Sequence, residues 1–240
     1  MQHTIHIPRF LLALAFGGLL AACSNPAKDQ QAHPDDKAGE TSRYPEGAIF
    51  PVAQLPKALG DWLSYYQAID SSVRLERFPG SGVALHFGPL EPAAAGDLGL
   101  KKAFYPLMAF SPDSSRALDW MSYGHQWTTD EKGVVHLTGG DTDQEVDLLE
   151  PARGRAHQLL FNGPESLVES AGWLGNQAFM LGTIQADPER QSFIPEILLF
   201  NLKDSTFTNF RLNHSLPDSL LVKAGNSYTR HWLKQKNIPQ

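Results

Sequence analysis

Apolar and polar positions alternate in short runs along most of the chain after residue 80. Turn-forming clusters rich in Gly, Pro, Asn, Asp and Ser separate these runs. Short apolar runs joined by such turns are typical of antiparallel hairpins, so the pattern predicts a mainly β fold. The predicted strands are 82–87, 103–110, 116–123, 133–138, 145–150, 156–161, 171–175, 177–184, 196–202 and 206–212.

Two segments outside this region have a helical period instead. Leu55, Leu59, Trp62, Tyr66 and Ile69 recur at intervals of four, three, four and three, which places them on one helical face. We expect this N-terminal helix to cover a face or an end of the sheet. The tail after Pro217 is also predicted to be helical, and within 226–237 Tyr228 and Trp232 are expected to pack against the body.

Two stretches of the chain echo each other. Residues 110–124 with 145–163, and residues 169–185 with 196–213, each read as two hairpins with an insertion between them. The sequence Phe110-Ser111-Pro112-Asp113 resembles the opening of a blade in TolB-like and WD-type β-propellers, and 146–149 and 199–202 loosely match the outer hairpin of such blades. The resemblance implies antiparallel sheets of two blade-like four-stranded units, flanked by an N-terminal and a C-terminal helix.

Two blades do not close a ring, because propellers use four to eight. The two units therefore stack as a sandwich closed by the helices, join a larger assembly, or are unrelated hairpins with similar turns.

The start of the chain has an apolar run, 10–20, that follows Arg9 and is too short to span a bilayer. It leads to Cys23, the only cysteine, after which the chain turns polar. The tetrapeptide Leu20-Ala21-Ala22-Cys23 resembles the lipobox of bacterial lipoprotein signal peptides. An ordinary secretory leader with a chance cysteine and a buried N-terminal helix are the alternatives.

The lipobox resemblance implies three segments: a signal peptide at 1–22, a lipidated Cys23 with a disordered polar tether to 47, and a β-rich globular domain at 48–240. The leader would be cut before Cys23, whose sulfur would carry diacylglycerol and whose amino group would be acylated, for example with palmitate. Several acyl chains anchor a protein stably where one does not. Ser24, in place of an Asp that would favour inner-membrane retention, favours the outer membrane of the cell envelope.

The net charge of the chain limits the classes of partner that it can bind. The chain has 20 Lys and Arg against 26 Asp and Glu, a formal net charge of −6. Binding to a phosphate backbone depends on many Lys and Arg contacts, so no nucleic-acid partner is expected.

Candidate chemistry is sparse, and no cofactor is expected. Asp141, Asp143, Glu145 and Asp147 alternate, so they would share one face of a strand or, in a loop, collect a Ca²⁺ ion. The EF-hand pattern fails because Val146 stands at the glycine position, and the acidic run is interpreted chiefly as solvated surface, with a weak calcium site as the alternative. His125 and His136 are candidates to meet across a hairpin, but their spacing matches no metal motif.

The leading hypothesis is a membrane-anchored envelope lipoprotein with a β-rich module that binds a partner protein or an envelope polymer. Trp120, Trp127 and Trp173 would line a sugar or peptide groove or, more simply, fill the core. The alternatives are an envelope hydrolase whose site is assembled from residues distant in sequence, and an accessory subunit that needs a partner to cover an open sheet edge.

Overall fold

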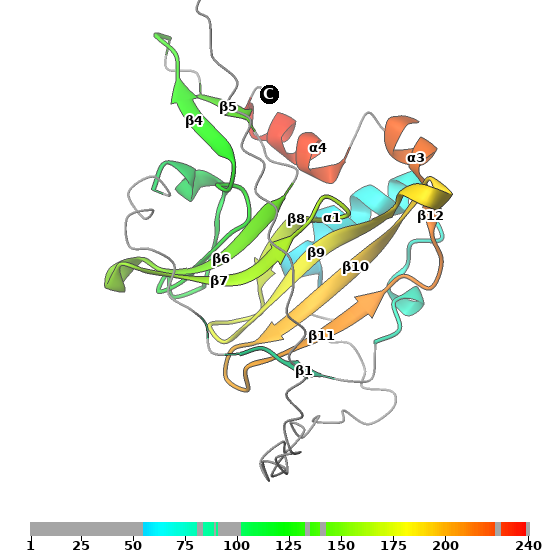
Figure 1. Cartoon of the computed structure of the whole chain (residues 1–240), viewed down its shortest axis with the longest axis horizontal. Coiled ribbons are helices and arrows are strands. Elements are labelled where there is room, and N and C mark those ends of the chain that lie inside the picture. The colour runs from blue at the N-terminus through cyan, green and yellow to red at the C-terminus, as the bar shows by residue number, and fades with distance from the viewer. Residues whose placement is uncertain are drawn as a thin grey trace, which may run out of the picture. The chain divides into compact units, whose positions relative to one another are not determined.

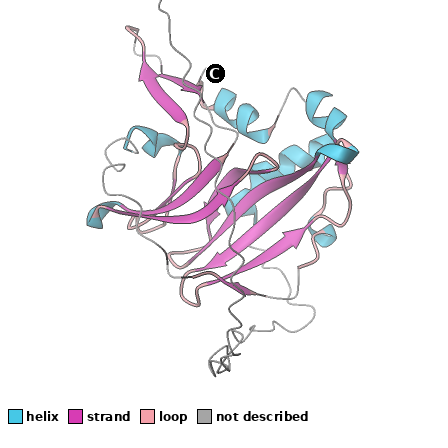
Figure 2. Ribbon diagram, in the orientation of Figure 1, coloured by secondary structure: helices cyan, strands magenta, loops and turns pink. Residues whose placement is uncertain are grey.

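The computed structural model describes residues 55–80, 84–88, 90, 102–132, 135–139, 143–223 and 227–238. The elements formed by these residues all belong to one compact unit, Gly39–Gln240. They are mainly antiparallel strands with helices near both ends of the described chain, which confirms the predicted fold class (Figures 1 and 2). The predicted leader, Cys23 and the tether lie outside the described residues.

The first predicted four-stranded unit is a sheet with the strand order β2-β3-β6-β7. Its strands are β2 (Ala109–Phe110), β3 (Ala117–Asp119), β6 (Gln144–Glu150) and β7 (Arg155–Asn162). A separate two-stranded hairpin, β4 (His125–Thr129) with β5 (Val135–Gly139), is inserted between β3 and β6. The short helix η4 (Pro151–Arg153) forms the turn between β6 and β7.

One strand prediction in this unit is wrong over most of its length. Residues 103–110 were expected to be a strand, but the 3-10 helix η3 (Lys102–Leu107) occupies most of this segment and only β2 is extended. Pro106 lies inside η3 and has no N–H to donate to a strand ladder, which favours the helical turn.

The second predicted unit is the meander β8 (Ser166–Trp173), β9 (Ala178–Asp187), β10 (Ser192–Asn201) and β11 (Thr206–Arg211). Two short strands extend it to six: β1 (Leu85–His86) beside β11 and β12 (Leu216–Pro217) beside β10. The helix η5 (Pro188–Arg190) joins β9 to β10, and η1 (Leu75–Arg77) precedes β1.

The predicted N-terminal helix is α1 (Leu55–Ile69), and it packs on the six-stranded sheet. Four of the five residues predicted on its apolar face are buried: Leu55, Leu59, Trp62 and Tyr66. The helix is kinked at Leu59, whose φ of −132° is not helical and which precedes Gly60. The predicted helical tail contains α3 (Asp218–Lys223) and α4 (Tyr228–Gln235), in which Tyr228 is buried as expected.

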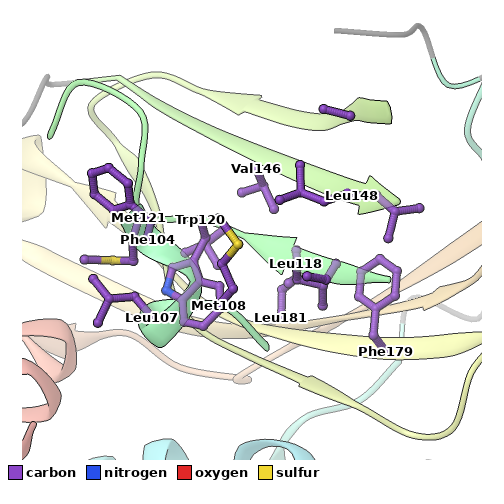
Figure 3. Packing of buried hydrophobic residues seen from close by; sticks show 14 of the residues in the cluster. Phe104, Leu107, Met108, Leu118, Trp120, Met121, Val146, Leu148, Phe179 and Leu181 are labelled. Carbon is purple, nitrogen blue, oxygen red and sulfur yellow. The ribbon is translucent and has the colours of Figure 1, made fainter. Parts of the chain in front are cut away.

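The six-stranded sheet is covered by apolar side chains on both faces, because successive strand residues point to opposite sides. On β9, Phe179 and Leu181 join the core shared with the four-stranded sheet, whereas Met180 joins the core under α1. Figure 3 shows Val146 and Leu148 of β6 across this shared core from Phe179 and Leu181. The molecule is therefore layered as sheet, sheet and helix.

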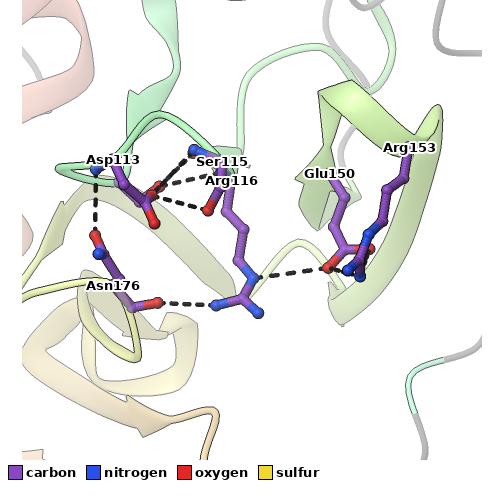
Figure 4. Close-up of polar contacts among 7 residues, drawn as sticks. Asp113, Ser115, Arg116, Glu150, Arg153 and Asn176 are labelled. Atoms are coloured by element: carbon purple, nitrogen blue, oxygen red, sulfur yellow. Dashed lines mark hydrogen bonds and ion pairs between the residues drawn. The ribbon is translucent and has the colours of Figure 1, made fainter.

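A group of hydrogen bonds connects the two sheets at the turn between β2 and β3. Asp113 accepts hydrogen bonds from Ser111 and Ser115, which closes this turn (Figure 4). Its backbone N–H donates to Asn176 Oδ1 at 3.2 Å, and the Arg116 guanidinium donates to Asn176 O at 2.9 Å. The Phe-Ser-Pro-Asp turn of one unit thus docks on the β8–β9 turn of the other.

Candidate functional site

A cleft of about 580 Å³ lies between hairpin β4–β5, the start of β6 and α4. Figure 1 shows the hairpin extending beside α4, beyond the end of the four-stranded sheet. Its apolar lining includes Met121, Leu137, Leu167 and Leu233, which come from separate parts of the chain. The volume falls in the range of roughly 300–1,000 Å³ typical of small-ligand pockets.

The Gln144 side chain holds the two sheets together at the base of this cleft. Its Nε2 donates to Trp120 O and to Val168 O, both at 2.9 Å, and its Oε1 accepts from Val168 N at 2.6 Å. Because the buried amide uses both its donor and acceptor atoms, it orients β8 against the segment after β3. The base of the cleft is thereby preorganised.

The polar lining carries charges of both signs. Asp143 at the start of β6 and Arg230 on α4 both line the cleft, and neither forms an ion pair within the described part of the chain. His125 Nδ1 lies 3.0 Å from Tyr123 O, and a carbonyl oxygen only accepts, so Nδ1 carries a proton and donates it to Tyr123.

Two buried polar atoms of cleft residues have no hydrogen-bond partner in the part of the chain that the structure describes: Trp120 Nε1 and Thr229 Oγ1. Leaving a buried donor or acceptor unsatisfied is costly, and such atoms are uncommon in folded proteins. They lie on the two sides of the contact between α4 and the sheet, where Trp120 also meets Trp232 at 6.0 Å between ring centroids. The hydrogen-bonding groups at the contact between α4 and the sheet are therefore only partly satisfied.

Glu169 on β8 is a buried carboxyl that joins three elements. Its Oε2 accepts from Trp62 Nε1 at 3.1 Å and from Tyr66 OH at 2.5 Å, both on α1. Its Oε1 accepts from the backbone N–H of Tyr228 at 3.1 Å, which caps the N-terminus of α4 in place of a Ser227 side-chain bond. Burial raises the pKa of Glu169 to about 7, although the hydrogen bonds oppose this shift.

The structure separates the predicted acidic residues. Asp143 lines the cleft, Glu145 is half-buried on β6, and Asp141 lies outside the described residues. Asp147 is buried, not solvated as expected, because it sits in the middle of the four-stranded sheet opposite Asp119 of β3. Among the described residues, no group of three or more His, Cys, Asp or Glu side chains is placed to hold a metal ion.

The other sequence candidates also take separate places. His125 lies opposite Gly139 and His136 lies opposite Thr128, so the two histidines are not a cross-strand pair. Trp120 is buried and borders the cleft, while Trp173 donates its Nε1–H to Ala109 O at 2.8 Å between the two sheets. Trp127 belongs to β4.

Glu169 and Gln144 were not identified from the sequence. The available signal for Glu169 was a single carboxylate among the apolar and small residues of Ser166–Trp173, a strand that must be buried to pair with β9. No protein-family model, curated protein or solved structure matches the chain. The helices of the described residues are all too short or too polar to cross a membrane.

Proposed function

We propose that this protein is a lipid-anchored component of the bacterial cell envelope that binds a partner protein or an envelope polymer in the cleft between hairpin β4–β5 and α4. The outer membrane is favoured by Ser24. The lipobox Leu20–Cys23 and the polar segment after it support the anchor. The cleft itself supports binding, because it combines an apolar floor with two charged groups that form no ion pair among the described residues.

The charges indicate what the cleft prefers. A ligand that brings a positive group to Asp143 and a negative group to Arg230 would gain two charge-assisted hydrogen bonds, which are stronger than neutral ones. Its apolar part would be seated on Met121, Leu137 and Leu233. Peptides and amino-containing polymers have this combination of groups.

Replacing Cys23 by serine is expected to release the protein from the membrane fraction. Serine has no thiol to receive diacylglycerol, so the acyl chains that hold the protein at the bilayer are lost. Incorporation of labelled palmitate and fractionation of cells measure the effect. A serine variant that stays in the membrane and still incorporates palmitate would contradict the anchor.

A photo-crosslinking amino acid at Thr138, an exposed residue of the cleft, is expected to capture the ligand in intact cells. The matched control places the same group at Glu189, an exposed residue on the turn between β9 and β10. The Arg230→Gln and Asp143→Asn variants should each reduce the Thr138 adduct. Equal adducts from both positions, or a Thr138 adduct indifferent to both variants, would count against the cleft.

A further inference from the structure

A second polar cluster lies away from the cleft, where the loop after α1 meets the segment after β11. Ser72 Oγ is 2.8 Å from His214 Nε2, although 142 positions separate the two residues. His214 Nδ1 in turn lies 2.9 Å from Asn213 Oδ1. Three side chains therefore form a continuous chain of hydrogen bonds from a hydroxyl through an imidazole to an amide.

The position of the proton on the His214 ring follows from the atom that accepts its hydrogen bond. The amide oxygen of Asn213 only accepts, so His214 Nδ1 carries the ring proton. His214 Nε2 then presents its lone pair to Ser72 Oγ, 2.8 Å away. A hydroxyl held on the free nitrogen of an imidazole that a third group orients is the arrangement of an activated nucleophile.

The backbone on both sides holds this geometry in place. Ser72 N donates to Asp70 Oδ1 at 2.8 Å and Val73 N donates to Asp70 O at 3.0 Å, and the buried Val73 side chain anchors the loop. On the other side, Asn213 N donates to Arg77 O at 2.9 Å. The nucleophile and its base are thus presented by two braced segments.

Asp70 supplies a negative charge beside the pair. Hydrogen bonds from Ser72 lower the pKa of this carboxyl, and the nearby His214 lowers it further. An ionised Asp70 stabilises the imidazolium that forms when His214 takes a proton. A surface cavity of about 390 Å³ opens at the preceding residue, Ser71, and is lined by that residue with Gln67, Arg74, Leu75 and Glu76.

We propose that Ser72 is a nucleophile for acyl transfer, with His214 as its general base and Asn213 as the residue that positions the base. Ser72 Oγ forms a bond to the acyl carbon of an ester while His214 Nε2 takes the hydroxyl proton. The ester C–O bond breaks and the leaving oxygen receives that proton. Water, deprotonated by His214, then cleaves the acyl-Ser72 ester and restores the hydroxyl. This activity goes beyond the proposed binding function and does not depend on the cleft.

The surroundings of Ser72 indicate the substrate class. The backbone N–H groups of Ser72 and Val73 already donate to Asp70, so they are not free to stabilise an oxyanion. Arg74, whose Nε donates to Ser71 O, is the cation that lines the neighbouring cavity. The site therefore fits esters with a good leaving group rather than amides.

The test is covalent labelling of the purified full-length protein with p-nitrophenyl acetate and, separately, with a fluorophosphonate probe. We expect one acetyl or phosphonyl group on Ser72, located by peptide mass spectrometry. Ser72→Ala should abolish this label, and His214→Gln should slow it by about a hundredfold, the lower end of a general-base contribution. Ser215→Ala, which removes an exposed hydroxyl next to His214, is the matched control and should label like the wild type.

Thermal unfolding of each variant separates loss of the nucleophile from loss of the fold. Labelling of Ser72 at the wild-type rate in a folded His214→Gln variant would overturn the general-base role. Labels only on lysines or other serines, unchanged by Ser72→Ala, would overturn the site. Either result would leave the cleft and the lipid anchor unaffected, since both are tested in cells with other variants.

Discussion

Replacing Gly172 by alanine is expected to lower the free energy of unfolding by about 3 kcal/mol, the upper part of the range for overpacked cores. Gly172 on β8 lies under α1, where a Cβ atom would meet the backbone of Ala58. It would lie 2.6 Å from Ala58 Cα and 2.7 Å from Ala58 C, and its nearest neighbour would be Ala58 O. Backbone atoms cannot rotate away, so α1 must shift as a unit.

The consequence of that shift is large because α1 contributes Leu55, Trp62 and Tyr66 to the core on this side of the sheet. Urea denaturation of the globular domain measures the change in free energy. Gly163→Ala is the control, because nothing lies within 4 Å of a Cβ at that position. Equal stabilities of the two variants would show that α1 does not pack on β8 as described.

The stability of the domain is expected to fall as the pH rises from about 4.5 to about 7, by about 3 kcal/mol from Glu169 alone. Burial raises the pKa of Glu169 from 4.5 to about 7 in the folded state. Between these values the folded protein binds a proton that the unfolded chain releases. The stabilisation is therefore complete below about 4.5 and is lost as the pH rises through about 7.

The measurement compares the free energy of unfolding at about pH 5 and about pH 8 in the wild type and in Glu169→Gln, which cannot titrate at this position. The variant retains every other titrating group, so the difference between the two slopes belongs to Glu169. The control is Glu165→Gln, at an exposed position directly before β8. It should keep the wild-type dependence of stability on pH. A Glu169→Gln slope equal to that of the wild type would contradict this assignment.

Glu169 also links stability to the cleft. Its carboxylate accepts from the backbone of α4 and from the side chains of Trp62 and Tyr66, so it ties the wall of the cleft to α1. Thr229 and Arg230 follow Tyr228 directly and line the cleft. A change at Glu169 is therefore expected to alter ligand binding as well as stability.

The periodicity of apolar residues predicted most of the fold, because it indicates which side of each helix or strand is buried. The face of α1 containing Leu55, Trp62 and Tyr66 was legible in the sequence, and so were the four hairpins whose turns are rich in Gly, Pro, Asn, Asp and Ser. The strand predicted at 103–110 was wrong because an apolar run by itself does not distinguish a strand from a short helix.

The residues of the candidate sites could not be predicted from the sequence in this way. Glu169 owes its raised pKa to burial, and its hydrogen-bond partners lie more than fifty residues away in the chain, so no local pattern brings Trp62 or Tyr228 to it. Asp147 belongs to an acidic run that reads as solvated surface, yet its pairing opposite Asp119 buries it. Ser72 and His214 each occur without any motif that marks them as partners.

By itself, the sequence determined the class of fold, the buried face of α1 and the hairpins, because each depends on residues close together in the chain. Only the tertiary structure decided which sheets share a core, where the cleft opens, which carboxyl is buried and which hydroxyl meets an imidazole. Local spacing sets the direction of a side chain, whereas its partners and its solvation are set by segments that folding brings together from distant parts of the chain.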